Sequence, residues 1–294
     1  MGGTSGIGEN TAREFVRYAS QPHVYIVGRN ASQADSLKAE FQELNSETKF
    51  QFIQSDVSLL KNVDKVCDEI KANENKINLL VLSQGIITTK HEETSEGLDK
   101  KFSLHYYSRL RFTENLLSLL KKAGSSEPKS PARVISVLGA GLETSLNTND
   151  LALKSNYGLR ACADHAITMN TMAFEQLATD NKDVVFIHSQ PGGVAGTNIN
   201  RELPGFVSTL MNGLNGIGIF KPWLISAKES GERQVWSGTV ASLTSGKAVL
   251  LGSKNEPTGN INKLTKLKED GTQDKIWKHT MSVFEKICEN NEKY

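Results

Sequence analysis

The stretch Met1-Gly2-Gly3-Thr4-Ser5-Gly6-Ile7-Gly8 decides the fold, and the rest of the chain is best understood outward from it. Its glycines follow the spacing G-x-x-x-G-x-G, and residues 9–19 have the apolar spacing of an amphipathic helix. A glycine-rich turn that leads into a helix offers free N–H groups and the positive end of the helix dipole to an anion. The stretch therefore predicts a diphosphate-binding turn, if it stands in a strand–turn–helix context.

Strand and helix patterns alternate along the remaining chain. Strands are predicted at 24–27, 50–53, 77–82, 134–138, 184–187 and 248–251, and the intervening helices at 32–44, 60–70, 98–122, 157–179 and 229–243. Mostly apolar strands, each followed by a helix, indicate a parallel sheet that is covered on both faces. The expected fold is therefore α/β, a Rossmann-like doubly wound sheet in three layers. Ligands of such sheets bind at the carboxyl ends of the strands, where Gly28, Gly85, Gly139 and Gly192 fall.

The strand that should precede the glycine-rich turn is missing from the sequence. That strand is central in this fold, so its absence predicts two unpaired inner edges. Either the sheet closes up, or a gap remains beside the cofactor site. A truncated coding sequence is the favoured explanation, and it predicts low stability and weak cofactor binding.

Composition narrows the class of protein. The chain has 294 residues, and its net charge of +1 gives no field that would favour nucleic acid or an anionic membrane. Cys67, Cys162 and Cys288 lie far apart and show no metal-ligand spacing. No signal peptide and no apolar run of about 20 residues is present. These features predict a cytoplasmic protein of one domain (1–294), with no metal, nucleic-acid or membrane partner.

Two segments depart from the strand–helix alternation. Residues 197–224 are rich in glycine and leucine, and we interpret them as a substrate lid over the strand ends, with an ordinary surface excursion as the alternative. Residues 271–291 have the apolar stripe of a terminal helix that packs on the core or on a second subunit.

Five motifs, in order, resemble those of the short-chain dehydrogenase/reductase family, in particular a subgroup common in fungi. Residues 2–8 are similar to its glycine-rich motif, and Asp56-Val57 matches the acidic residue that contacts adenine. Residues 82–85 stand at its turn after the next strand, and residues 191–194 are similar to the motif that closes over the nicotinamide. Tyr157 stands for the active-site tyrosine. The cofactor-binding residues that the resemblance implies are Gly2, Thr4, Ser5, Gly6, Ile7, Gly8, Arg29, Asp56, Val57, Ser83, Gly85, Pro191, Gly192, Val194 and Thr197.

Arg29 bears on which nicotinamide cofactor is bound. It directly follows the second strand of the family's pattern, where an acidic residue would accept hydrogen bonds from the ribose 2′-hydroxyl group. A guanidinium there instead pairs with a 2′-phosphate. With no acid at residues 28–30, the resemblance implies NADP(H).

The catalytic residues of the family are incompletely matched. Its tyrosine moves a proton to or from the carbonyl oxygen, a lysine four residues later lowers the pKa of that tyrosine, and a serine donates a hydrogen bond to the same oxygen. Here Tyr157 is followed by Arg160 at three residues and Ala161 at four. Ser136 is the serine candidate, although by register the family serine falls at Leu138 or Gly139.

A second register is open. If residues 175–178 mark the end of the family's helix, the tyrosine position falls near Ala161 and the lysine position near His165. Tyr157 is then a loop residue before the helix, and Asp164 and His165 face the site. The resemblance places His105 where the family has the helix asparagine that supports its proton relay.

Two functional hypotheses of different class follow. The first is an NADP(H)-dependent ketoreductase or alcohol dehydrogenase acting on an apolar carbonyl or alcohol in fungal secondary metabolism, with Tyr157, Ser136 and Arg160 as its catalytic set. The second is a dehydrogenase-like protein that binds a dinucleotide or metabolite, or catalyses a non-redox step. The resemblance also implies a homo-oligomer as a candidate assembly.

Overall fold

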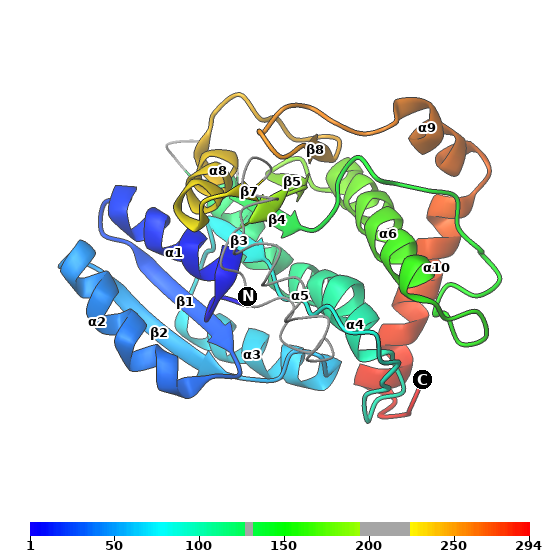
Figure 1. Ribbon diagram of the computed structural model, residues 1–294, viewed down its shortest axis with the longest axis horizontal. Coiled ribbons are helices and arrows are strands. Elements are labelled where there is room, and N and C mark those ends of the chain that lie inside the picture. The colour runs from blue at the N-terminus through cyan, green and yellow to red at the C-terminus, as the bar shows by residue number, and fades with distance from the viewer. Residues whose placement is uncertain (127–131, 195–223) are drawn as a thin grey trace, which may run out of the picture.

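The computed structural model describes residues 1–126, 132–194 and 224–294 (Figure 1). The strands of its sheets are β1 His23–Gly28, β2 Lys49–Gln54, β3 Leu79–Leu82, β4 Ala132–Val137, β5 Val184–Ser189, β6 Gly193–Val194, β7 Leu224–Ile225 and β8 Val249–Leu251. The larger sheet has the order β3-β4-β5-β8, β1 pairs with β2, and every ladder is parallel. Helices connect these strands, so the predicted α/β class and parallel sheet are confirmed.

The helices follow the predicted alternation, with two differences and one additional helix, Ile261–Glu269, that the sequence analysis does not predict. They are α1 Gly6–Tyr18, α2 Ala34–Leu44, α3 Leu60–Asn73, α4 Lys100–Phe102, α5 Ser108–Gly124, α6 Leu159–Asp180, α8 Ala227–Thr239, α9 Ile261–Glu269 and α10 Thr272–Phe284. The single helix predicted at 98–122 is interrupted by a π-helical turn, Ser103–Tyr107. The helix predicted from residue 157 begins two residues later, with Gly158 at its N-cap. Tyr157 therefore lies in the loop before α6.

Side chains of alternate strand residues enter different cores. Val134 and Phe186 belong to the largest hydrophobic core, which also contains buried residues of α3, α5 and α6. Their neighbours Ile135, Val185 and Ile187 belong to a separate core on the other face. Since the side-chain period of a strand is two, β4 and β5 are buried on both sides. The result is the three-layer arrangement that the sequence predicts.

The sheet is in two parts in the region that the structure describes. No ladder joins β1 to β3, and the first residues of the chain lie between the ends of these strands (Figure 1). The backbone N–H of Gly2 donates to the Val27 carbonyl (3.0 Å), and the N–H of Ser83 donates to the Met1 carbonyl (3.1 Å). The amino group of Met1 donates to the Val81 carbonyl (2.7 Å). These bonds place the glycine-rich turn at the carboxyl ends of both sheet parts.

The C-terminal region covers the outer face of α6. α10 packs against α6 and continues into a π-helical turn, Glu285–Glu289, that contacts α3. Ile276, Phe284 and Ile287 are buried in the largest core. The segment interpreted as a lid lies outside the described residues, apart from Leu224. Within the described ranges, no helix combines the length and the hydropathy needed to cross a bilayer.

Candidate functional site

The glycine-rich turn packs tightly against the end of β3. Gly2 has a φ of +75°, and a Cβ added to it would lie 2.7 Å from the Gln84 backbone nitrogen. A Cβ on Gly8 would overlap Ser83 Oγ and lie 2.5 Å from the Gly2 carbonyl oxygen. Such distances require glycine, because no real Cβ is tolerated there. The sequence motif therefore forms a compact turn at the start of α1.

The start of α1 presents its backbone N–H groups to the exterior. Ser5 is the N-cap residue and makes no side-chain capping bond, and Thr4, Ser5, Gly6 and Ile7 are partly exposed. The first N–H groups of a helix have no partner within the helix. Residues 4–7 thus have the backbone arrangement that can accept an anion, and their binding of a diphosphate stays a prediction.

A groove of about 500 Å³ opens at the carboxyl ends of β1 and β2, beside α3. We call it the Arg29 groove; its lining residues are Arg29, Ile53, Gln54, Ser55, Asp56, Asn62, Lys65, Val66 and Glu69. Asp56 Oδ1 accepts hydrogen bonds from Ser58 N (3.0 Å) and Ser58 Oγ (2.8 Å), and Val57 is buried beneath. The structure therefore brings Arg29 and Asp56, predicted from separate motifs, to one groove.

The turn after β3 lies against His105 of the π-helical turn. A Cβ on Gly85 would lie 2.6 Å from His105 Nε2, and the backbone N–H of Ile86 donates to this nitrogen (3.3 Å). Burial and the nearby Arg109 and Lys101 lower the pKa of His105 to about 3. His105 is therefore neutral at physiological pH, and its Nε2 is an acceptor. It replaces the asparagine of the family's pattern without carrying charge.

The motif after β5 forms the start of a small separate sheet. Gly192 has a φ of +71°, and β6, which contains Val194, pairs with β7 in parallel. Pro191 is partly exposed and Gly192 is exposed, so this turn is open to a ligand at the carboxyl end of β5. Thr197 lies outside the described residues.

Ser136 is fully buried and its hydroxyl is engaged on both sides. It accepts a hydrogen bond from Arg109 Nη1 (2.9 Å) and donates to Asn170 Oδ1 (2.9 Å). With its hydrogen directed at Asn170, Ser136 has none to donate to a substrate oxygen. The predicted catalytic serine is thus placed as a support between β4 and α6.

Arg109 is a buried cation that the sequence motifs did not single out. Its guanidinium donates to the Gln84 carbonyl (2.6 Å), the Val137 carbonyl (2.8 Å) and the Leu104 carbonyl (3.2 Å), besides Ser136. Burial lowers the pKa of Arg109 to about 9. It holds together the ends of β3 and β4 and the π-helical turn.

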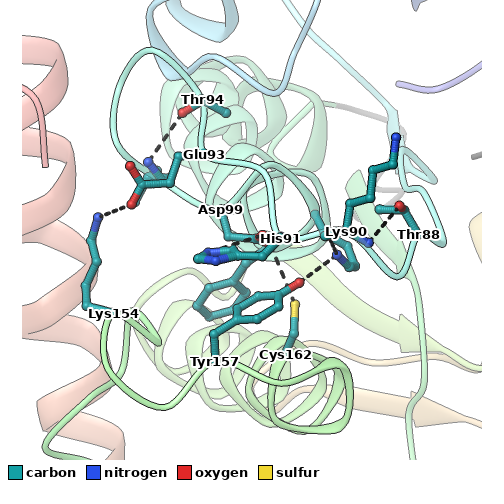
Figure 2. A network of polar contacts seen from close by, with 12 residues as sticks. Thr88, Lys90, His91, Glu93, Thr94, Asp99, Lys154, Tyr157 and Cys162 are labelled. Atoms are coloured by element: carbon teal, nitrogen blue, oxygen red, sulfur yellow. Dashed lines mark hydrogen bonds and ion pairs between the residues drawn. The ribbon is translucent and has the colours of Figure 1, made fainter.

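Tyr157 lies in a compact polar cluster (Figure 2). Lys101 Nζ donates to Tyr157 Oη at 2.7 Å, and the His91 ring stacks on the Tyr157 ring with centroids 4.0 Å apart. Asp99 lies beside them, with its carboxylate 3.9 Å from His91 Nε2 and 4.0 Å from Cys162 Sγ. We call Tyr157, His91, Asp99, Lys101 and Cys162 the Tyr157 cluster. Burial, with the charges of Asp99 and Cys162, raises the pKa of Tyr157 above its ordinary value, so the phenol stays protonated at neutral pH.

Arg160 does not reach Tyr157. Its side chain is 93% exposed, and its Nε lies 3.6 Å from Asp164 Oδ2 one helical turn later. His165 is buried, and its Nδ1 lies 2.9 Å from the Ala161 carbonyl oxygen, while its Nε2 has no hydrogen-bond partner. The cation that contacts Tyr157 is Lys101, which comes from a different helix and 56 residues earlier.

A second buried network fixes the loop after β4. The backbone N–H of Gly139 donates to His188 Nε2 (3.3 Å), so His188 carries its hydrogen on Nδ1 and donates to Thr171 Oγ1 (2.8 Å). The Thr171 hydroxyl then donates to Glu143 Oε1 (2.8 Å), which also accepts from the Gly141 N–H (3.1 Å). Burial, with Arg109, lowers the pKa of His188 to about 3, so this chain of bonds stays neutral at His188. No sequence motif pointed to it.

Both the fold and the turns at the strand ends define a dinucleotide-binding class of α/β protein. The family model for short chain dehydrogenases matches residues 1–207. The chain therefore belongs to the short-chain dehydrogenase family, as the sequence motifs indicate.

Relatives and solved structures agree with this assignment. The chain is 39% identical to the oxidoreductase AN1596 of Emericella nidulans, over 97% of this chain and 91% of the relative. It is 30% identical to the short-chain dehydrogenase/reductase SAT2 of Stachybotrys chartarum, over 99% and 92% of the two chains. Its fold is similar to that of an NADPH-bound carbonyl reductase from chicken fatty liver, with a TM-score of 0.61 and 16% identity over 88% of this chain and 96% of that one. The similarity to fungal proteins thus extends over nearly the whole sequence.

Proposed function

We propose that the protein is an NADP(H)-dependent oxidoreductase that acts on an apolar carbonyl compound or alcohol, with Tyr157 as the proton donor or acceptor. The observation that carries the proposal is the Tyr157 hydroxyl, whose raised pKa keeps it protonated and which contacts a buried lysine. The chain also belongs to a family whose chemistry uses a tyrosine.

The cofactor half rests on the glycine-rich turn and the Arg29 groove. Residues 4–7 at the start of α1 would hold the diphosphate, and Asp56 and Val57 would contact the adenine. Arg29, at the same groove, would pair with the 2′-phosphate of NADP(H), whereas an acid would be needed to favour NAD(H). The similarity in fold to proteins described as NADPH- and NADP-bound is consistent with this choice.

The nicotinamide supplies or accepts a hydride when the cofactor is bound. Ser83, Gly85 and the turn at Pro191 and Gly192 would orient it at the carboxyl ends of β3 and β5. In the reductive direction the protonated Tyr157 would donate its hydrogen to the carbonyl oxygen. Because the pKa of Tyr157 is raised, the phenol keeps its proton at neutral pH, so the group is present in the form that can donate a proton.

The exposed surface around this end of the molecule supports an apolar substrate. Ile87, Leu142 and Leu159 are large apolar residues that are 42 to 54% exposed. Ile87 lies just after the turn at Gly85, and Leu142 lies in the loop that contains Gly139. Leu159 is the first residue of α6, two residues after Tyr157. A role in fungal secondary metabolism is part of this proposal and is carried by the resemblance to the fungal subgroup; relatives of the chain are fungal proteins described as oxidoreductases.

Ser136 favours the second hypothesis, a binding protein or non-redox catalyst. Its hydroxyl is engaged by Arg109 and Asn170, so one hydrogen-bond donor of the family's catalytic set has no counterpart at that position.

One assay separates these functions. The purified chain is mixed with NADPH and a panel of apolar ketones and aldehydes, and the loss of reduced-nicotinamide absorbance is followed, while cofactor binding is measured by fluorescence titration. Oxidation of NADPH that depends on the carbonyl compound supports the oxidoreductase. Tight NADPH binding without turnover on any member of the panel supports the second function.

A further inference from the structure

Lys101 is an unusually placed lysine. It is only 6% exposed, yet the described contacts of its ammonium group include no carboxylate. Its Nζ donates to the Lys90 carbonyl (3.1 Å) and to Tyr157 Oη (2.7 Å), and it lies 5.4 Å from the centroid of the Tyr157 ring. A buried ammonium is costly unless its hydrogen bonds are satisfied. Two of its three hydrogens are therefore committed to fixed acceptors.

The direction of the Lys101–Tyr157 bond matters. An ammonium group has no lone pair, so Lys101 can only donate to the phenol oxygen. The hydrogen of the Tyr157 hydroxyl is therefore left for another acceptor, and the Asp99 carboxylate is one, since its hydrogen bond with Tyr157 contributes to the raised pKa of the tyrosine. The stacked His91 ring holds the plane of the phenol ring at an interplanar angle of 19°, which further restricts the direction of the hydroxyl.

Lys101 also lies beside the predicted nicotinamide end. Its charge acts on His105, whose Nε2 accepts from the Ile86 N–H just after the cofactor turn at Gly85. Lys101 and His105 are separated by one turn of the α4 and π-helical segment. Lys101 thus belongs to the same α4 and π-helical segment whose His105 contacts the turn at Gly85.

We propose that Lys101 is the positioning residue of Tyr157, supplying from α4 the positive charge that the family places four residues after its tyrosine; this rests on the function proposed above. When the Tyr157 O–H bond breaks, its proton forms the O–H bond of the product alcohol, and the electron pair stays on Oη as a phenolate. The Lys101 ammonium faces that phenolate at hydrogen-bond distance and stabilises it. Transfer of one Nζ proton to Oη then restores the phenol, and water returns a proton to the amine.

The test compares Lys101→Met with Lys100→Met in the full chain. Lys100 is the adjacent residue, and its Nζ pairs with Glu92 at 3.1 Å, away from Tyr157. For K101M we expect kcat to fall about 10- to 100-fold, which corresponds to the loss of one charge-assisted hydrogen bond, with the NADPH dissociation constant unchanged. K100M should keep kcat within about twofold. Lys101→Arg keeps the charge and should recover part of the lost kcat, whereas a lysine that only fills space would not be rescued in this way.

A readout that needs no turnover separates failure of this proposal from failure of the proposed function. In protein labelled with ¹³C at the tyrosine ζ carbon, the Tyr157 signal is assigned by its loss in Tyr157→Phe. At pH 7 this signal should move in K101M and stay in place in K100M, because among the described residues Lys101 is the one that donates to Oη. A Tyr157 signal that K101M leaves in place, or an unchanged kcat in an active K101M enzyme, overturns the role of Lys101. If the signal moves in K101M but the unchanged chain reduces no carbonyl compound, the contact between Lys101 and Tyr157 is supported and the proposed oxidoreductase function is overturned.

Discussion

The Arg29 groove and the Tyr157 cluster are assembled in different ways. In the groove, Arg29 and Asp56 lie just after two adjacent parallel strands, so their spacing in the sequence already places them together, while Asn62, Lys65 and Glu69 are added by α3. The Tyr157 cluster instead joins the loop after β3, the start of α4, the loop before α6 and α6 itself. Side chains placed by strand ends can be found by motif, whereas a cluster held by loops depends on how those loops pack.

The largest expected effect comes from substitution of Tyr157, which should change turnover but leave cofactor binding unchanged. Tyr157→Phe should lower kcat by about 10²- to 10⁴-fold, because the proton donor is lost, while NADPH binding stays as in the unchanged chain. Steady-state NADPH oxidation and fluorescence titration measure the two quantities. If kcat is retained, the Tyr157 cluster is not the reaction centre and the contrast with the groove disappears.

A smaller effect is expected at the turn that serves the cofactor side. Gly8→Ala should lower the free energy of unfolding by about 1–3 kcal/mol and weaken NADPH binding, because the new Cβ overlaps Ser83 Oγ. Gly158→Ala is the matched control, since a Cβ there meets no atom within 4 Å, and it should stay within about 0.5 kcal/mol. Urea unfolding measures both. Equal stabilities would mean that the turn does not need glycine.

The next smaller effect is expected on the preference for NADPH over NADH. Arg29→Ser should weaken NADPH binding by about 10-fold and leave NADH binding nearly unchanged, because one ion pair to a 2′-phosphate is lost. Lys49→Ser removes the same charge at the opposite end of β2 and serves as the control. An equal loss of affinity for NADPH and NADH would contradict the proposed pairing of Arg29 with the 2′-phosphate.

The smallest effect is expected at Arg160. Arg160→Ala removes an exposed pair with Asp164, and its effect on kcat should be less than about twofold, with stability within about 0.5 kcal/mol. The same two assays apply. A loss of kcat as large as that expected for K101M would return the role of electrostatic helper to the helix that follows Tyr157.

Most of the fold was predictable because parallel strands and their helices leave strong periodic signals. The predicted strand at 184–187 lies within β5, and the helix predicted at 60–70 lies within α3. The start of α6 was predicted two residues early, since Gly158 carries no strong capping signal. The π-helical turn at Ser103–Tyr107 was also missed, because its sequence reads as continuous helix.

The sequence by itself determined the family, the parallel α/β fold, the glycine-rich turn and the meeting of Arg29 with Asp56, because each follows from local spacing at strand ends. Only the tertiary structure decided which cation contacts Tyr157 and what occupies Ser136. Lys101 and Tyr157 are 56 residues apart, and Arg109 reaches Ser136 across 27 residues. Contacts of this kind arise from the packing of loops and helices over a finished sheet, and no short-range pattern in the chain encodes them.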